Sequence, residues 1–186
     1  MTSATHLTIL RMTFVPIFVV FMVYNDLALA LAIFLLASIT DLMDGIVARK
    51  FGQKTALGAF LDPVADKLLL TSSFILLSLD TLELTIRIPA WLTITVIGRD
   101  VLMVVAVLVI SIVKGPRLFL PSIFGKIATV LQLLTVLVVL VANQFTIQLN
   151  YLEIMFYLTF ILTLVSGVHY MAEGMKFFGH DNDYLD

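Results

Sequence analysis

Residues 27–46 have the sequence LALALAIFLLASITDLMDGI, an apolar segment that ends with two aspartates, Asp41 and Asp44. A helix of about 20 mainly apolar residues spans the hydrocarbon core of a bilayer, so this segment predicts a transmembrane helix. Charged side chains inside such a helix are costly and are usually kept for function. The segment therefore indicates an all-helical integral membrane protein with a polar site at one end of this helix.

The composition of the whole chain agrees with this interpretation. Of 186 residues, 61% are hydrophobic and 13% are charged, against about 45–50% and about 25% in soluble domains. The net charge of −2 gives no reason to expect nucleic acid as a partner. The chain has no cysteine, which excludes disulfides, zinc–thiolate sites and thiol catalysis.

Six apolar stretches are long enough to span a membrane. They predict a six-transmembrane-helix bundle that forms one domain, residues 1–178, followed by a short polar tail, residues 179–186. The predicted spans are approximately residues 7–24, 27–46, 60–79, 88–113, 122–142 and 152–172.

The short loops predict the orientation of the chain, because lysine and arginine gather on the cytoplasmic side of a membrane. These residues follow the second, fourth and sixth predicted spans, at Arg49, Lys50, Lys54, Lys114, Arg117 and Lys176. The opposite loops contain Asp26, Asp80, Glu83 and Arg87. We therefore expect both termini, and the aspartate end of the second span, to face the cytoplasm.

A second aspartate pair, Asp62 and Asp66, lies near the predicted cytoplasmic start of the third span. Spacings of three and four residues place each pair on one face of a helix. A short loop joins the two spans, so the helices should be antiparallel neighbours with both pairs at the same depth. Carboxylates that lie close together need compensation, and all-oxygen sites favour Mg²⁺, Mn²⁺ or Ca²⁺. Carboxylates that bridge two metal ions are used for displacement at phosphorus.

Small residues and one arginine accompany the aspartates. Gly45 and Ala48 on the second span, and Gly58 before the third, remove side-chain bulk and allow a ligand or helix to approach closely. Arg49 stands about one helical turn beyond Asp44 and can pair with phosphate through its fork of donors.

The complete pattern resembles the signature of the CDP-alcohol phosphatidyltransferases. It consists of DLMDGIVAR at residues 41–49, eight further residues, and GAFLDPVAD at residues 58–66. All eight fixed positions match in identity and spacing, and the resemblance extends over most of the chain.

The resemblance implies a membrane enzyme of phospholipid biosynthesis that moves the phosphatidyl group of CDP-diacylglycerol to an alcohol and releases CMP. It implies two divalent ions, Mg²⁺ or Mn²⁺, held by Asp41, Asp44, Asp62 and Asp66, and it implies that Asp66 is also the general base. The CDP moiety would be bound by Gly45, Ala48, Arg49 and Gly58. The resemblance also favours a homodimer in a bacterial inner membrane, with an organellar inner membrane as the alternative.

The acceptor alcohol depends on charged residues outside this signature. Arg99 and Asp100 fall in the middle of the fourth predicted span, Arg117 lies in the loop after it, and Lys126 is near the start of the fifth. We interpret Arg99, Arg117 and Lys126 as a basic pocket for an anionic acceptor phosphate. The alternative is a structural Arg99–Asp100 pair, with Arg117 and Lys126 as ordinary cytoplasmic-side residues.

Two branches of the family with glycerol-type acceptors are similar to this chain. Thr8 and Arg11, and later Ser166 and Gly167, resemble the phosphatidylglycerophosphate synthases, which use glycerol 3-phosphate. Residues 99–101 and 117–126 resemble the cardiolipin synthases, which use phosphatidylglycerol. We favour glycerol 3-phosphate and keep phosphatidylglycerol as the alternative.

Two interpretations without an enzyme stay open. An ion-coupled transporter could use buried carboxylates as an ion path. Such transporters more often have matched helices broken by glycine or proline, and their carboxylates lie near the midplane rather than at one face. A structural membrane protein could instead carry the aspartates as an assembly site.

Overall fold

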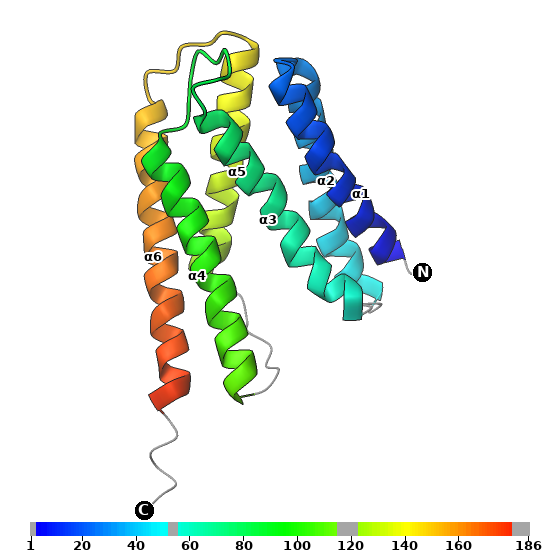
Figure 1. The fold of residues 1–186 in the computed structure, drawn as a ribbon, viewed down its shortest axis with the longest axis vertical. Helices are drawn as coiled ribbons and strands as arrows, with labels where there is room; N and C mark the ends of the chain where they lie inside the picture. The colour runs from blue at the N-terminus through cyan, green and yellow to red at the C-terminus, as the bar shows by residue number, and fades with distance from the viewer. Residues whose placement is uncertain (1–2, 52–55, 115–122, 180–186) are drawn as a thin grey trace, which may run out of the picture. The chain divides into compact units, whose positions relative to one another are not determined.

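The computed structural model describes residues 3–51, 56–114 and 123–179, and these residues contain six α-helices and no β-strand. Side chains are described for residues 12–40, 67–106, 109 and 123–172. The helices are α1 (Ser3–Val23), α2 (Leu27–Phe51), α3 (Ala56–Ser78), α4 (Ala90–Lys114), α5 (Ile123–Gln144) and α6 (Leu152–Gly179) (Figure 1). The predicted all-helical class is therefore confirmed for this part of the chain.

Each predicted span coincides with one helix, although the helix ends differ from the predicted ends. At the C-terminal end, α6 continues to Gly179, past the predicted limit at residue 172. In the described part of the chain, α5 and the Leu152–Ala172 part of α6 are the two helices long and apolar enough to cross a membrane. The count of six spans stays a prediction.

Two helix ends are closed by the same backbone motif. Asn25 and Thr146 follow α1 and α5 in the left-handed conformation, with φ angles of 59° and 53°. The next residue in each case, Asp26 or Ile147, donates its N–H to a carbonyl five residues earlier, which satisfies the helix end. Asp26 then caps α2, because its Oδ1 accepts the N–H of Leu29 at 3.1 Å. The chain thus reverses between α1 and α2 within three residues.

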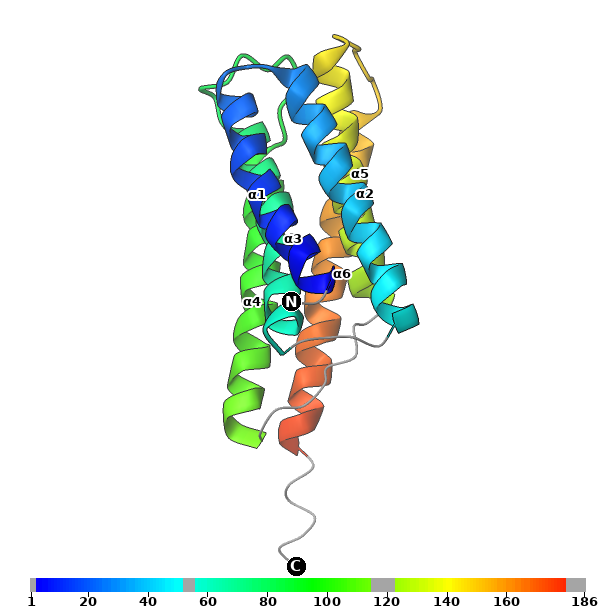
Figure 2. The ribbon, with the colours of Figure 1, turned by 90° about the vertical axis from the view of Figure 1, so that its right-hand side faces the viewer.

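Met1–Pro89 and Leu134–Asn150 form one compact unit, in which α1 packs against both α2 and α3 (Figure 2). Phe18, Phe34 and Phe74, one from each helix, are completely buried. The ring centroids of Phe18 and Phe34 are 6.0 Å apart, with the rings tilted by 48°. Such a pair contributes about 0.5–1.5 kcal/mol beyond its burial. This packing orients the two helices that carry the aspartates.

The segment between α3 and α4 is attached to the same unit by the backbone bond from Ile88 N–H to the Leu77 carbonyl, at 2.9 Å, and by a side-chain amide. Asn143, near the end of α5, accepts the N–H of Ile86 at 2.9 Å and donates Nδ2 to the Ile86 carbonyl at 2.8 Å. The same Nδ2 also donates to the Val139 carbonyl at 2.8 Å. Leu82, Leu84 and Ile88 of the segment are buried. The segment therefore has a fixed course even though it is not helical.

Ala90–Leu133 and Tyr151–Asp186 form the second compact unit. Here α4 packs along α6, and both helices run in the same direction (Figures 1 and 2). Buried residues of α6 recur at alternating spacings of four and three, at Leu152, Phe156, Thr159, Thr163, Ser166 and Tyr170. This spacing keeps one face of a helix turned toward its neighbours. The middle of that face consists of hydroxyl residues rather than aliphatic ones.

Replacement of Asn143 should loosen the segment between α3 and α4. Asn143→Ala removes all three hydrogen bonds and leaves the N–H and carbonyl of Ile86 without their partner. We expect the free energy of unfolding to fall by about 2–3 kcal/mol and the melting temperature of the detergent-purified protein to fall by roughly 5–10 °C. Gln144→Ala, at the next and half-buried position, is the control. Equal melting temperatures for the two variants would show that Asn143 does not stabilise the segment between α3 and α4.

Candidate active site

The four aspartates lie on two helices of the first compact unit. Asp41 and Asp44 belong to α2, and Asp62 and Asp66 belong to α3. These helices run in opposite directions, as predicted, and residues 52–55 connect them at one end (Figure 1). Both pairs therefore belong to the end of the unit where this connection lies.

The two pairs lie at matching distances from that end. Asp41 precedes the end of α2 by ten residues, and Asp66 follows the start of α3 by ten. Asp44 and Asp62 are seven and six residues from the same helix ends. At a rise of about 1.5 Å per residue, Asp41 and Asp66 lie about 15 Å from these helix ends, and Asp44 and Asp62 lie about 10 Å from them. The helix boundaries thus bring the two pairs to one level.

The side chains of these aspartates lie outside the part of the chain whose side chains are described. The same is true of the predicted CDP-binding residues Gly45, Ala48, Arg49 and Gly58. On the backbone, the first three of these follow Asp44 within α2, and Gly58 is in the first turn of α3. Among the side chains that are described, no three His, Cys, Asp or Glu form a metal-binding group. The roles of the aspartates as ligands and base stay predictions.

The three predicted acceptor residues lie in different settings. Arg99 is in α4 and is buried, with 5% of its surface exposed. Lys126 is in α5 and is exposed. Arg117 lies outside the described residues. The structure therefore gives the surroundings of Arg99 in detail, and the joint pocket stays a prediction.

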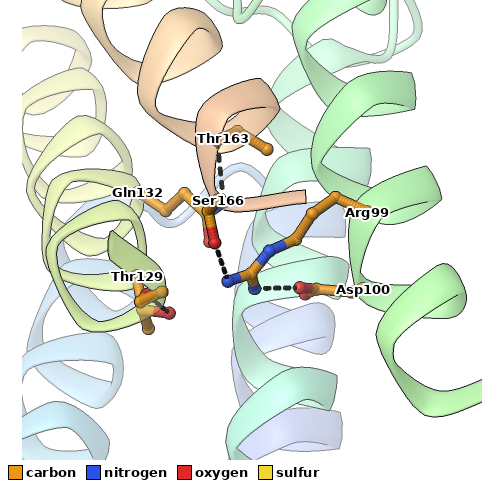
Figure 3. Close-up of polar contacts among 7 residues, drawn as sticks. Arg99, Asp100, Thr129, Gln132, Thr163 and Ser166 are labelled. Carbon is orange, nitrogen blue, oxygen red and sulfur yellow. Dashed lines mark hydrogen bonds and ion pairs between the residues drawn. The ribbon is translucent and has the colours of Figure 1, made fainter. Parts of the chain in front are cut away.

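The guanidinium of Arg99 is held at two points (Figure 3). Its Nη1 donates to Asp100 Oδ1 at 2.8 Å, and its Nη2 donates to Ser166 Oγ at 2.6 Å. Asp100 and Ser166 are buried as well, with 7% and 0% of their surfaces exposed. The Nε of Arg99 is buried and has no hydrogen-bond partner in the described part of the chain. The guanidinium is thus fixed in place with one N–H donor unused.

A second polar contact lies one helical turn away on α6. Gln132 of α5 donates its Nε2 to Thr163 Oγ1 at 3.1 Å, and both residues are completely buried (Figure 3). The Oε1 of Gln132 has no hydrogen-bond partner among the residues described. Through two hydroxyls on one face, α6 is therefore bonded to α4 by Ser166 and to α5 by Thr163.

The pair of Arg99 and Asp100 is a poor device for holding helices together. The two residues are adjacent on the same helix, so the ion pair between them does not itself connect α4 to another helix. Burial of two charges costs several kcal/mol of desolvation per ion, and the pair offsets this only when its geometry and hydrogen bonds are excellent. The hydrogen bond of Arg99 to α6 goes to a neutral serine, Ser166. Charged side chains inside an apolar helix are usually kept for function.

Sequence reasoning identified Arg99 as a candidate but missed Gln132 and Thr163. Ser166 was noticed only as part of a family resemblance. The available signal was the regular spacing of the hydroxyl residues Thr159, Thr163 and Ser166 on the buried face of α6. That spacing shows a polar face, but it does not by itself identify the side chain on the partner helix.

Comparison with known proteins gives a consistent result. A family model described as CDP-alcohol phosphatidyltransferase matches residues 1–165. The chain is similar to a probable phosphatidylglycerophosphate synthase of Mycobacterium tuberculosis, with 31% identity over 95% of this chain and 83% of that protein. It is similar to a cardiolipin synthase (CMP-forming) of Homo sapiens, with 32% identity over 94% and 62%. It is also similar to a CDP-diacylglycerol–glycerol-3-phosphate 3-phosphatidyltransferase of Aquifex aeolicus, with 30% identity over 91% and 94%.

A double-mutant cycle tests the coupling of the buried ion pair. Asp100→Leu leaves the guanidinium of Arg99 buried without its counter-ion, and we expect a loss of about 3–5 kcal/mol in the free energy of unfolding. In the double variant with Arg99→Met no unpaired charge remains, so much of this loss should be recovered. Denaturant or thermal unfolding in detergent measures each stability. If the changes in the free energy of unfolding caused by the two substitutions are additive, Arg99 and Asp100 do not stabilise each other.

Proposed function

The chain belongs to the CDP-alcohol phosphatidyltransferase family, and on that premise we propose that it transfers the phosphatidyl group of CDP-diacylglycerol to glycerol 3-phosphate and releases CMP. The names of the relatives from Mycobacterium tuberculosis and Aquifex aeolicus support this acceptor. The observation that carries the proposal is the common level of the two aspartate pairs on α2 and α3.

The donor set suits a divalent metal centre. Carboxylate oxygens, without thiolate or imidazole in the signature, favour Mg²⁺ or Mn²⁺ over zinc or copper. Two such ions would be held by Asp41, Asp44, Asp62 and Asp66. When bound, they supply positive charge to the diphosphate and to the departing CMP.

Asp66 has a second task in the proposed reaction. Its carboxylate accepts the proton of the acceptor hydroxyl, and the hydroxyl oxygen forms a bond to the lipid-bearing β-phosphorus of CDP-diacylglycerol. The bond from this phosphorus to the bridging oxygen breaks, and CMP leaves with the electron pair. An ion-coupled transporter needs no such base, and membership of the family favours the enzyme.

The residues around the aspartates would bind the CDP moiety. Gly45 and Ala48 on α2 and Gly58 on α3 are at the aspartate end of their helices, where small side chains leave room for a nucleotide. Arg49 lies within the last turn of α2 and would pair with the diphosphate through its planar fork of donors.

The acceptor phosphate would be bound by Arg99 together with Arg117 and Lys126. Burial of the Arg99 guanidinium and its unused Nε–H support this assignment. A hydrogen bond from a charged donor to a phosphate oxygen is roughly twice as strong as one between neutral groups. Water exclusion around Arg99 would increase this preference for an anion.

Phosphatidylglycerol is the second candidate acceptor. The similarity to the human cardiolipin synthase favours it, as does the resemblance of residues 99–101 to that branch. Both acceptors present a glycerol hydroxyl and a phosphate group. The same base and the same arginine would therefore serve either one.

The proposed enzyme crosses the membrane six times, with both termini and the aspartate site on the cytoplasmic side. The two apolar helices of the described residues support a membrane location, and the lysine and arginine residues of the loops support the orientation. We further propose a homodimer in a bacterial inner membrane, with an organellar inner membrane as the alternative.

CMP release is the direct test of this function. Purified protein should release CMP from CDP-diacylglycerol when Mg²⁺ or Mn²⁺ and glycerol 3-phosphate are present, and should stop when EDTA removes the metal. Asp66→Asn retains the shape of the side chain but removes the base, so the rate should fall by at least about 100-fold. Phosphatidylglycerol in place of glycerol 3-phosphate tests the second acceptor. Absence of release with both acceptors would contradict the proposal.

The absence of cysteine allows a clean test of the orientation. Glu83→Cys, at an exposed position between α3 and α4, should react with a membrane-impermeant maleimide in intact cells. Lys176→Cys, near the end of α6, should react only after the membrane is permeabilised. The unsubstituted protein is the control for background labelling. The reverse pattern would show that the orientation is wrong.

A further inference from the structure

The side chain of Arg99 is shaped by two consecutive residues of α6. Its stem passes beside Gly167, where an added Cβ would lie 3.4 Å from Arg99 Cγ. Its Nη2 ends 2.6 Å from the hydroxyl of Ser166. One residue therefore leaves space for the stem, and the residue before it receives the end of the side chain.

Ser166 fixes the orientation of the guanidinium plane. Asp100 contacts Nη1 from the same helix as Arg99, so that contact alone permits the plane to rotate with the side chain. The bond from Nη2 to Ser166 adds a second fixed point on another helix. Together with the covalent attachment of the guanidinium to the side-chain stem, these two contacts determine its plane, and with it the direction of the unused Nε–H.

A hydroxyl suits this task better than a carboxylate would. Serine accepts a hydrogen bond from Arg99 but adds no negative charge. The positive charge of the guanidinium is therefore offset by Asp100 and is not reduced further by a second carboxylate. α6 itself is held one turn earlier by the bond of Thr163 to Gln132 (Figure 3). Ser166 is thus a fixed acceptor on a helix that is bonded on two sides.

We propose that Ser166 and Gly167 are positioning residues that direct the guanidinium of Arg99 toward the acceptor phosphate. This inference rests on the proposed function, because it assigns Arg99 to the acceptor. It predicts that loss of the Ser166 hydroxyl, or a side chain larger than alanine at position 167, alters binding of the acceptor and leaves the use of CDP-diacylglycerol unchanged. A role in stability alone would change both in the same way.

The test compares Ser166→Ala with Ser166→Thr in purified protein. We expect Ser166→Ala to raise the KM for the acceptor by roughly tenfold, since it removes a hydrogen bond to a charged group. The KM for CDP-diacylglycerol should stay within about twofold of the original value, and Ser166→Thr, which keeps the hydroxyl, should restore much of the acceptor affinity. Gly167→Ala, which adds only a contact at van der Waals distance, should have a small effect, and Gly167→Val a large one.

Ser73→Ala is the matched control. Ser73 is also completely buried, but its hydroxyl donates to a carbonyl of its own helix, that of Leu69 at 2.8 Å. It should leave both KM values unchanged. An unchanged acceptor KM in Ser166→Ala, or a parallel rise in both KM values with a lowered melting temperature, would overturn the inference.

A binding measurement separates this inference from the proposed function. Inorganic phosphate should raise the melting temperature of the unsubstituted protein and should do so less in Ser166→Ala. If the protein releases no CMP but this difference is found, the proposed function fails, and the part of the inference that stands is that Ser166 positions Arg99 for a phosphate group. If CMP release is normal and Ser166→Ala behaves like the unsubstituted protein in both assays, the positioning role fails and the function stands. Failure of both CMP release and phosphate binding would overturn both.

Discussion

A charge in an apolar helix needs compensation, and this constraint governs both polar regions of the chain. Only 13% of the residues are charged, yet four aspartates gather at one level of α2 and α3. A buried arginine occupies the face of α4 that packs on α6. Cations would compensate the first group, whereas a neighbouring carboxylate and a serine hydroxyl compensate the second. The packing of the helices holds the aspartates on α2 and α3 and the contacts of Arg99 in place.

The helices could be predicted from the sequence because a membrane span has a simple length requirement. The extension of α6 to Gly179 was missed because its last turns, around Lys176, are too polar to count as part of a span. The course of the segment between α3 and α4 was missed for another reason. It is held in part by the amide of Asn143, which bonds to the backbone of a residue 57 positions earlier in the chain, and such a contact leaves no periodic pattern.

The aspartates could be predicted because charge inside an apolar segment is rare, and because each pair has a helical spacing, three residues on α2 and four on α3. Neutral polar residues give a weaker signal. Ser166 and Thr163 are tolerated in apolar helices, where a hydroxyl can bond to its own backbone, as Ser73 does. Only the contact with another helix distinguishes a hydroxyl that holds Arg99 from one that satisfies itself, and that contact requires the structure.

In the proposed reaction, the polar network around Arg99 would recognise a feature that both candidate acceptors share. Glycerol 3-phosphate and phosphatidylglycerol each present phosphate oxygens, and one oriented N–H donor would serve either. They differ in what is attached on the far side of the phosphate, which is nothing in the first and a diacylglycerol in the second. Under this proposal, the donor that Asp100 and Ser166 hold in place would determine where the phosphate lies. Discrimination between the acceptors then falls to the residues that admit or exclude acyl chains at the bilayer, where apolar surface rather than charge decides the outcome.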